Sequence, residues 1–232
     1  MVNWEKVGRP PRAARSALSF EVIAIGGIEL ADCDGLDAVT MRKVADRIGA
    51  GAMSLYRYVD SRDDLIDLMV DRVSAEAVAA PPTGDWRADL TAMAHTIRQV
   101  ALRHPWLARQ VPTADAFGPG TIAMTESHLS LLDGHGFDIE QMLDIWRTVL
   151  AFVQGYAHAE ARRLEAGRRG GAREAAAAPS SYLDRVAESG GYPLTARALR
   201  GAGARAEPER AFDRRLGFLL DGLAGTFFAG PR

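Results

Sequence analysis

The residues that could do chemistry gather between positions 40 and 62, where cations, hydroxyl groups and aromatic rings alternate with small residues. Arg42 and Lys43 stand at the start of an expected helix, where a positive charge opposes the helix dipole and gains from a nearby anion. Tyr56 and Tyr58 follow, and such hydroxyls bond phosphate oxygens while their rings rest on sugars or thymine methyl groups. Residues 40–58 carry four cations and one anion, which favours contact with a polyanion.

Two short helices joined by a glycine turn must position these side chains. Thr40 is a suitable N-cap for the first helix, and Gly49 ends it in the left-handed conformation. The second helix is expected over about Ala52–Tyr58, with Leu55 and Val59 in the core. The residues left facing outward are Ala52, Met53, Ser54, Tyr56, Arg57 and Tyr58. This geometry is typical of a helix-turn-helix in the DNA major groove, and a helical hairpin with a solvated charged face is the alternative.

The run TMRKVADRIGAGAMSLYRYVDSRDDLIDLMVDRV resembles the DNA-binding domain of the tetracycline-repressor (TetR) family. Its specific part is the Ser-Leu-Tyr-Arg-Tyr-Val core, followed by Arg62 and the entry to a long helix. The motif covers about residues 15–75, and the remainder fits by length and helical pattern. The resemblance implies a homodimeric transcription regulator, usually a repressor, that a small molecule releases from DNA.

The same resemblance implies roles for individual residues. Thr40 and Tyr58 would clamp phosphates, and Arg62 would hold another phosphate. The residues expected at or near bases are Arg42, Ala52, Met53 and Ser54, with Tyr56 on the backbone or a thymine methyl and Lys43 beside the polyanion. One departure is Gly26-Gly27 inside the expected first helix, where each glycine costs about 1 kcal/mol relative to alanine. The pair marks either a close helix crossing or a bend.

Composition describes a globular chain of 232 residues, 47% hydrophobic and 25% charged. The net charge of −2 excludes a general polyanion binder, so any nucleic-acid contact must come from a local patch. No apolar run approaches the ~20 residues that a membrane helix needs. The single cysteine, Cys33, excludes an intrachain disulfide and fits a cytoplasmic protein. A packing role for Cys33 is favoured over a reactive thiol.

Helical periodicity throughout predicts an all-α fold of about 9–10 helices. The family resemblance implies an N-terminal three-helix unit and a C-terminal helical ligand-binding and dimerisation domain. We expect a flexible basic arm over 1–16, a helix-turn-helix domain over 17–79 and a second domain over 84–232. Residues 167–180 read as a mobile loop. The arm either enters the minor groove or is a frayed tail. The predicted helices span about 14–32, 62–78, 86–103, 121–134, 139–166, 193–199 and 209–228, and Gly118-Pro119-Gly120 is expected to break the chain.

Two of these helices, about 139–166 and 209–228, are apolar on more than one face, which predicts burial on both sides. Two from each subunit would make a four-helix homodimer interface, as is usual in the family; a purely intramolecular core is the alternative. Two-fold symmetry then places two recognition helices on half-sites roughly 34–36 Å apart. The predicted partner is therefore a near-palindromic DNA operator.

A second expected partner is a small, largely apolar effector. The residues that could line its cavity are Met93, Ile97, His104, Trp106, Val111, Met124, His128, Trp146, Leu150 and Gln154. Each of these alone is more often a core residue. In tetracycline-binding members of the family, a histidine that holds the drug's magnesium falls near Val111, and its absence here argues against a metal–tetracycline complex.

Catalysis is not expected. The five histidines show no metal-ligand spacing, and the chain has neither a Gly-x-Ser-x-Gly elbow nor a phosphate-cradling Gly-x-x-x-x-Gly-Lys loop. We therefore predict no cofactor and no metal site. A transcriptional activator or a ligand-independent DNA-binding regulator is the alternative to a ligand-released repressor. A helical dimeric interaction module with a vestigial motif is a third class.

Overall fold

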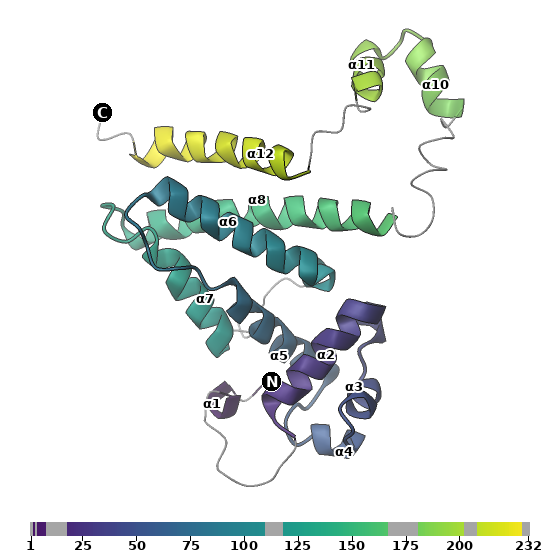
Figure 1. The fold of residues 1–232 in the computed structure, drawn as a ribbon, viewed down its shortest axis with the longest axis vertical. Helices are drawn as coiled ribbons and strands as arrows, with labels where there is room; N and C mark the ends of the chain where they lie inside the picture. Colours follow the sequence, from purple (N-terminus) through teal and green to yellow (C-terminus); the bar gives the residue numbers. More distant parts are fainter. Residues whose placement is uncertain are drawn as a thin grey trace. The chain divides into compact units, whose positions relative to one another are not determined.

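The computed structural model describes residues 2, 4–7, 18–109, 118–166, 181–201 and 208–228, and these residues form helices without any strand (Figure 1). The all-α prediction is confirmed for these ranges. The chain divides into two compact units, Met1–His158 and Ala159–Arg232. The expected loop over 167–180, and the expected arm apart from Val2 and residues 4–7, lie outside the described residues.

The first unit begins with a short helix, α1 (Trp4–Val7), and the long helix α2 (Phe20–Asp34). The expected start of α2 near position 14 is wrong, because Leu18 and Ser19 are not helical. The Ser19 hydroxyl accepts a hydrogen bond from the Val22 amide at 3.1 Å and so caps the helix at Phe20. Cys33, in the last turn, is exposed, so the expected packing role is also wrong.

The helix-turn-helix follows as α3 (Met41–Arg47) and α4 (Ala52–Leu55), after a 3-10 turn, η1 (Leu36–Ala38). Helix α4 is shorter than expected, because the chain turns between Leu55 and Val59. Helix α5 (Arg62–Ser74) is capped by the Ser61 hydroxyl, which accepts from the Asp64 amide at 3.1 Å. It continues into η2 (Ala75–Ala77).

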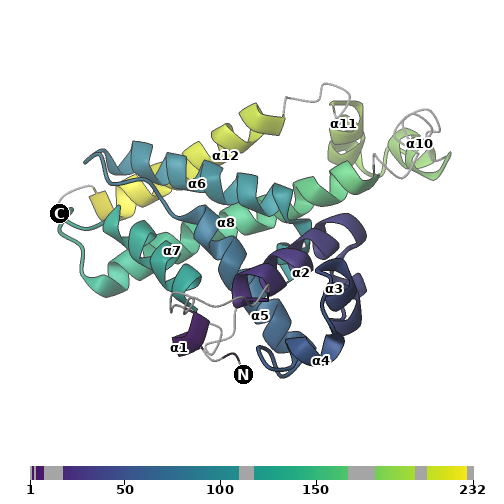
Figure 2. The ribbon, with the colours of Figure 1, turned by 60° about the horizontal axis from the view of Figure 1, so that its bottom comes forward.

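Gly26 and Gly27 mark close helix crossings and not a bend, since α2 runs unbroken through both. A Cβ atom on Gly26 would collide with the Ile48 side chain beside α3. A Cβ atom on Gly27 would lie 2.7 Å from the Met69 sulfur on α5. The two glycines therefore let α2 approach α3 and α5 more closely than alanine would, and Figure 2 shows α2 lying across α5.

Helix α6 (Trp86–Arg103) starts as predicted, with the Asp85 carboxylate accepting from the Arg87 and Ala88 amides. A 3-10 turn, η3 (Pro105–Arg109), follows. The predicted break is confirmed at Gly118, which is not helical, but helix α7 (Pro119–Ser130) begins two residues earlier than expected. The N-terminal end of α7 is capped by the buried Asp71 carboxylate of α5, which accepts from the Gly120 amide at 3.2 Å and the Thr121 amide at 2.8 Å.

Helix α8 (Ile139–Ala166) has the predicted bounds and buries one face along its length. The second unit contains α10 (Ser181–Glu188), α11 (Pro193–Gly201), α12 (Pro208–Leu223) and a π-helical turn, η5 (Ala224–Phe228). Helices α10 and α11 pack against each other. The buried residues of α12 are Ala211, Phe212, Leu216, Leu220 and Leu223, whereas Phe218 is exposed.

None of the described helices combines the length and apolarity that crossing a bilayer would require. Within the same ranges, no group of three or more histidine, cysteine, aspartate or glutamate side chains is arranged to hold a metal ion.

Candidate nucleic-acid interface

The helix-turn-helix is held by a capped first helix and a glycine turn. The Thr40 hydroxyl accepts from the Lys43 amide at 3.3 Å, and Gly49 adopts a φ of +67°. Such a φ is easiest for glycine, which lets the chain reverse directly into α4. Leu55 and Val59 are buried, as predicted, and fix α4 on the core. The turn and these two side chains decide which residues face outward.

The outward tip of α4 carries Met53 and Tyr56, which are 79% and 46% exposed. Ala52 and Ser54 are partly covered. An exposed methionine and an exposed aromatic ring on one short helix are costly in water unless a partner covers them. The tip therefore has the apolar and hydroxyl groups that contact thymine methyl groups and DNA backbone.

The cations of α3 lie beside this tip. The Arg42 side chain is 89% exposed and its Nε lies 4.0 Å from the Asp46 carboxylate, an exposed pair that holds the guanidinium weakly. Lys43 is also exposed. Arg47 differs from both, because its Nε donates to the Glu29 carboxylate on α2 at 2.9 Å. Arg42 and Lys43 are thus available to a polyanion, whereas Arg47 ties α3 to α2.

Tyr58 does not face outward as expected. Its hydroxyl donates to the Leu18 carbonyl at 2.9 Å, and its ring meets the edge of Phe20 at a centroid distance of 5.1 Å. The single phenolic proton is therefore used inside the protein, and the expected donation from Tyr58 to a phosphate is not available in this arrangement. Tyr58 instead fixes the entry to α2.

Arg62 also has different partners from the expected phosphate. Its Nε donates to the Val39 carbonyl and its Nη2 to the Leu36 carbonyl, each at 2.8 Å. These carbonyls belong to the turn that precedes the Thr40 cap. Arg62 thereby positions α3 from the first residue of α5. Sequence reasoning missed this role because Leu36 and Val39 lie more than twenty positions away and offer only backbone oxygens.

The residues expected to line an effector cavity differ in how far they are covered, and their role as a set stays a prediction. Met93 and Ile97 are buried on α6, Met124, Trp146 and Leu150 are partly covered, Gln154 is exposed, and Val111 lies outside the described residues. The two histidines and Trp106, which were expected to add polar groups to a cavity wall, have partners within the protein.

His128 is fully buried and both of its ring nitrogens are occupied. Its Nε2 lies 2.7 Å from the Ala77 carbonyl, and its Nδ1 accepts from the Trp146 indole at 3.1 Å. This arrangement needs the neutral ring with its proton on Nε2. Burial lowers the pKa of His128, although the Ala77 carbonyl opposes that shift. His128 and Trp146 therefore join η2, α7 and α8 and do not offer the cavity a free polar group.

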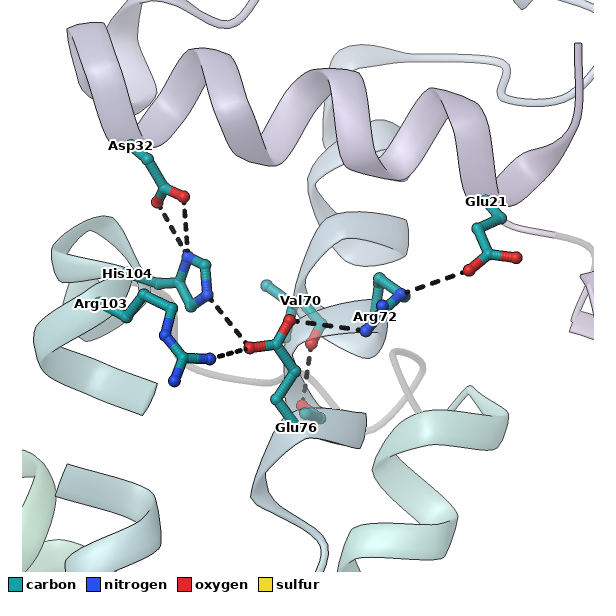
Figure 3. A network of polar contacts seen from close by, with 8 residues as sticks. Glu21, Asp32, Val70, Arg72, Glu76, Arg103 and His104 are labelled. Atoms are coloured by element: carbon teal, nitrogen blue, oxygen red, sulfur yellow. Dashed lines mark hydrogen bonds and ion pairs between the residues drawn. The ribbon is translucent and has the colours of Figure 1, made fainter. Parts of the chain in front are cut away.

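His104 and Trp106 bind a carboxylate on α2. His104 Nδ1 lies 2.9 Å from Asp32 Oδ1, and the Trp106 indole donates to the same oxygen at 2.8 Å. Figure 3 shows the His104 ring between Asp32 and Glu76. The polar atoms of both side chains are thus bonded to carboxylates of α2 and η2, and their place in a ligand cavity stays a prediction. Asp32 and Glu76 could not be predicted as partners from the sequence, because they lie 72 and 28 positions from His104.

Comparison with known protein families identifies the family of this chain. Residues 26–69 match the family model described as bacterial regulatory proteins, tetR family, and residues 78–227 match the tetracyclin repressor-like C-terminal domain. The chain belongs to the TetR family. It is a DNA-binding transcriptional regulator and not an enzyme.

Several TetR-family relatives match over most of the chain. The HTH-type transcriptional repressor DrrR1 of Streptomyces coeruleorubidus is 34% identical, over 83% of this chain and 73% of the relative. An HTH-type transcriptional regulator of Saccharopolyspora erythraea is 33% identical, over 94% of this chain and 90% of the relative.

Solved TetR-family structures match as well. Apo ActR of Streptomyces coelicolor has a TM-score of 0.71 and 24% identity, covering 91% of this chain and 97% of ActR. ActR in complex with actinorhodin has a TM-score of 0.69 and 26% identity, covering 92% of this chain and 99% of ActR.

Proposed function

We propose that this TetR-family protein is a cytoplasmic repressor that binds a near-palindromic operator as a homodimer and leaves it when a small, largely apolar molecule binds. The observation that carries the proposal is the exposed tip of α4, with Met53 and Tyr56 uncovered beside the exposed Arg42. A major-groove helix presents such a tip to base edges. The name of DrrR1 as a repressor supports the direction of regulation.

The side chains proposed to touch DNA are those the structure leaves available. Arg42, Ala52, Met53 and Ser54 face bases, and Tyr56 contacts the backbone or a thymine methyl. Lys43 and Thr40 lie by phosphates. Tyr58 and Arg62 act indirectly, through the turns that they hold. We propose that the DNA-binding domain spans residues 17–79 and that the effector-binding and dimerisation domain spans residues 84–232.

Dimerisation is proposed through α8 and α12, which is what two-fold operator symmetry needs. Phe218 is 67% exposed on α12, an aromatic side chain that no described part of the subunit covers fully. The effector is proposed to be bulky and apolar. ActR has been solved in complex with actinorhodin, which supports a small-molecule effector for this chain as well.

The experiment is selection of duplex DNA from a randomised pool by the full-length protein, followed by affinity measurement at fixed salt. We expect a selected site with two-fold symmetry. Arg42→Ala should weaken binding and relax base choice at one position per half-site by about 1–3 kcal/mol if the contact is bidentate.

Arg47→Ala is the matched control, because it removes the same charge from the same helix while its guanidinium is held by Glu29. It should leave base preference unchanged. Selection of no sequence, or of a site without symmetry, would contradict the proposal. Reporter expression from the selected site separates repression from activation, and an effector-insensitive reporter would favour the ligand-independent alternative.

A further inference from the structure

The carboxylate of Asp32 joins two parts of the first unit that are far apart in sequence. Asp32 lies in the last turn of α2, within the reader segment, which we define as α2 to α5 (Phe20–Ser74). Its oxygens lie 2.9 and 3.0 Å from His104 Nδ1, and one accepts from the Trp106 indole at 2.8 Å. His104 ends α6 and Trp106 lies in η3, so both donors come from the C-terminal family region.

Glu76 forms the other side of the same cluster. On η2, it accepts from Arg103 Nη1 at 2.7 Å and lies 3.4 Å from His104 Nε2 (Figure 3). Arg72 of α5 lies 3.5 Å from Glu76 and 3.8 Å from Glu21 at the start of α2. The charged groups around His104 are thus one carboxylate from α2, one from η2, and the two guanidinium groups that face Glu76.

The chemistry of this cluster depends on the protonation of one ring. Ionised carboxylates only accept hydrogen bonds, and a neutral imidazole has one N–H. Both ring nitrogens of His104 face carboxylate oxygens, so the geometry belongs to the ring that carries both protons. The side chain is 5% exposed, which leaves little room for water to replace either partner. His128, with one carbonyl and one indole as partners, needs the neutral ring instead.

We propose that Asp32, His104, Trp106 and Glu76 form a latch through which the C-terminal region fixes the orientation of α2, and that the doubly protonated His104 ring closes it. The proposal rests on the proposed DNA-binding function and names how that function is regulated. Helix α2 packs closely against α3 at Gly26 and against α5 at Gly27. A shift of its last turn therefore also shifts α3 and, with it, α4. A ligand that displaces η3 withdraws the Trp106 donor, and one that displaces His104 opens both carboxylate contacts.

The test uses the full-length protein and three variants, Asp32→Asn, His104→Gln and Trp106→Phe. Each should speed hydrogen exchange at the amides of residues 30–34 and weaken binding to the selected operator by about fivefold or more. Combining Asp32→Asn with either other change should add little, because both act through the same carboxylate. None of the three residues lies on α3 or α4, so a direct loss of DNA contact does not explain the result.

Glu29→Gln is the matched control. It removes one carboxylate from the same helix about one turn away, but Glu29 pairs with Arg47 inside the reader segment. We expect no change in exchange at residues 30–34 and less than about a twofold change in affinity, because the amide oxygen of the substituted side chain can still accept from Arg47. Equal effects of Glu29→Gln and Asp32→Asn, or full additivity in the combined variants, would overturn the latch.

Nitrogen-15 spectra of the unmodified protein test the ring itself and need no variant to fold. We expect both His104 ring nitrogens to be protonated in the closed latch, while His128 shows one protonated and one bare nitrogen. A singly protonated His104 ring would overturn the charge requirement. The hydrogen-exchange and nitrogen-15 measurements need no DNA. They therefore test the latch even if operator selection contradicts the proposed function.

Discussion

At the scale of single residues, the two buried histidines show how partners decide a role that residue type leaves open. His104 lies between carboxylates and His128 between a carbonyl and an indole. Both were expected to line a ligand cavity, because residue type alone does not distinguish a polar cavity residue from a buried one with partners inside the protein. Their partners place His104 against the reader segment and His128 in the core between η2, α7 and α8.

His128→Gln should alter how stability depends on pH. Burial lowers the pKa of the folded His128, whereas the unfolded ring takes a proton near about 6.5. The unfolded state therefore binds more protons below that pH, and the contribution of the neutral ring is present above about 6.5 and is lost as pH falls. The variant should lose about 1–3 kcal/mol at pH 8, because the Trp146 and Ala77 groups lose their partner, and the deficit should shrink toward pH 5.

Urea unfolding at several pH values measures this difference. His135→Gln is the control, since His135 is not buried, and it should change stability little at any pH. A deficit for His128→Gln that stays constant from pH 5 to pH 8 would contradict the neutral-ring assignment.

Residue roles that depend on backbone partners were beyond sequence reasoning. Thr40 and Gly49 were predicted correctly because capping and left-handed turns are local properties of a few consecutive residues. Tyr58 and Arg62 bond carbonyls 40 and 23 or 26 positions away, and a carbonyl has no residue-type signature. Roles that depend on a few consecutive residues could thus be predicted from the sequence, whereas roles that depend on tertiary contacts could not.

At the scale of elements, the bounds of two helices followed the sequence closely. Helix α6 begins after Asp85 and α8 spans Ile139–Ala166, both as predicted. The start of α7 was missed because its cap, Asp71, comes from a different helix 49 positions earlier. Gly118 and Gly120 read as a chain break, although they leave room for the Asp71 backbone and side chain.

The crossing of α2 over its neighbours gives a matched pair of substitutions. Gly26→Ala should destabilise the protein by about 1–3 kcal/mol, because the new methyl group meets the branched and stiff Ile48 side chain. Gly27→Ala should be close to neutral, since Met69 is flexible and can move while the helix gains about 1 kcal/mol of propensity.

Thermal and urea unfolding of the two variants checks the pair, with circular dichroism confirming unchanged helix content. A Gly26→Ala protein as stable as the unmodified one, or equal losses of stability at both positions, would mean that α2 approaches α3 no more closely than it approaches α5.

At the scale of the whole molecule, the glycines of α12 and η5 differ from those of α2. Around Gly222 and Gly225, no described atom of the chain lies within 4 Å of the position that a Cβ would take, leaving out chain neighbours and the helix backbone. Glycine costs about 1 kcal/mol in a helix, and no crossing with another described segment lies at these two positions. Together with the exposed Phe218, this favours a close approach by a second subunit, as the proposed dimer needs.

Phe218→Lys should therefore dissociate the proposed dimer. Burying a phenylalanine side chain is worth about 1.5–3 kcal/mol, and two-fold symmetry counts it twice. The dimer dissociation constant, measured by sedimentation equilibrium, should rise by about 100-fold or more, and operator binding should weaken at protein concentrations below the new constant. Tyr192→Lys is the control, because it replaces another aromatic residue, 61% exposed, outside both proposed interface helices. An unmodified protein that stays monomeric at every concentration, or equal effects of the two changes, would exclude α12 from the interface.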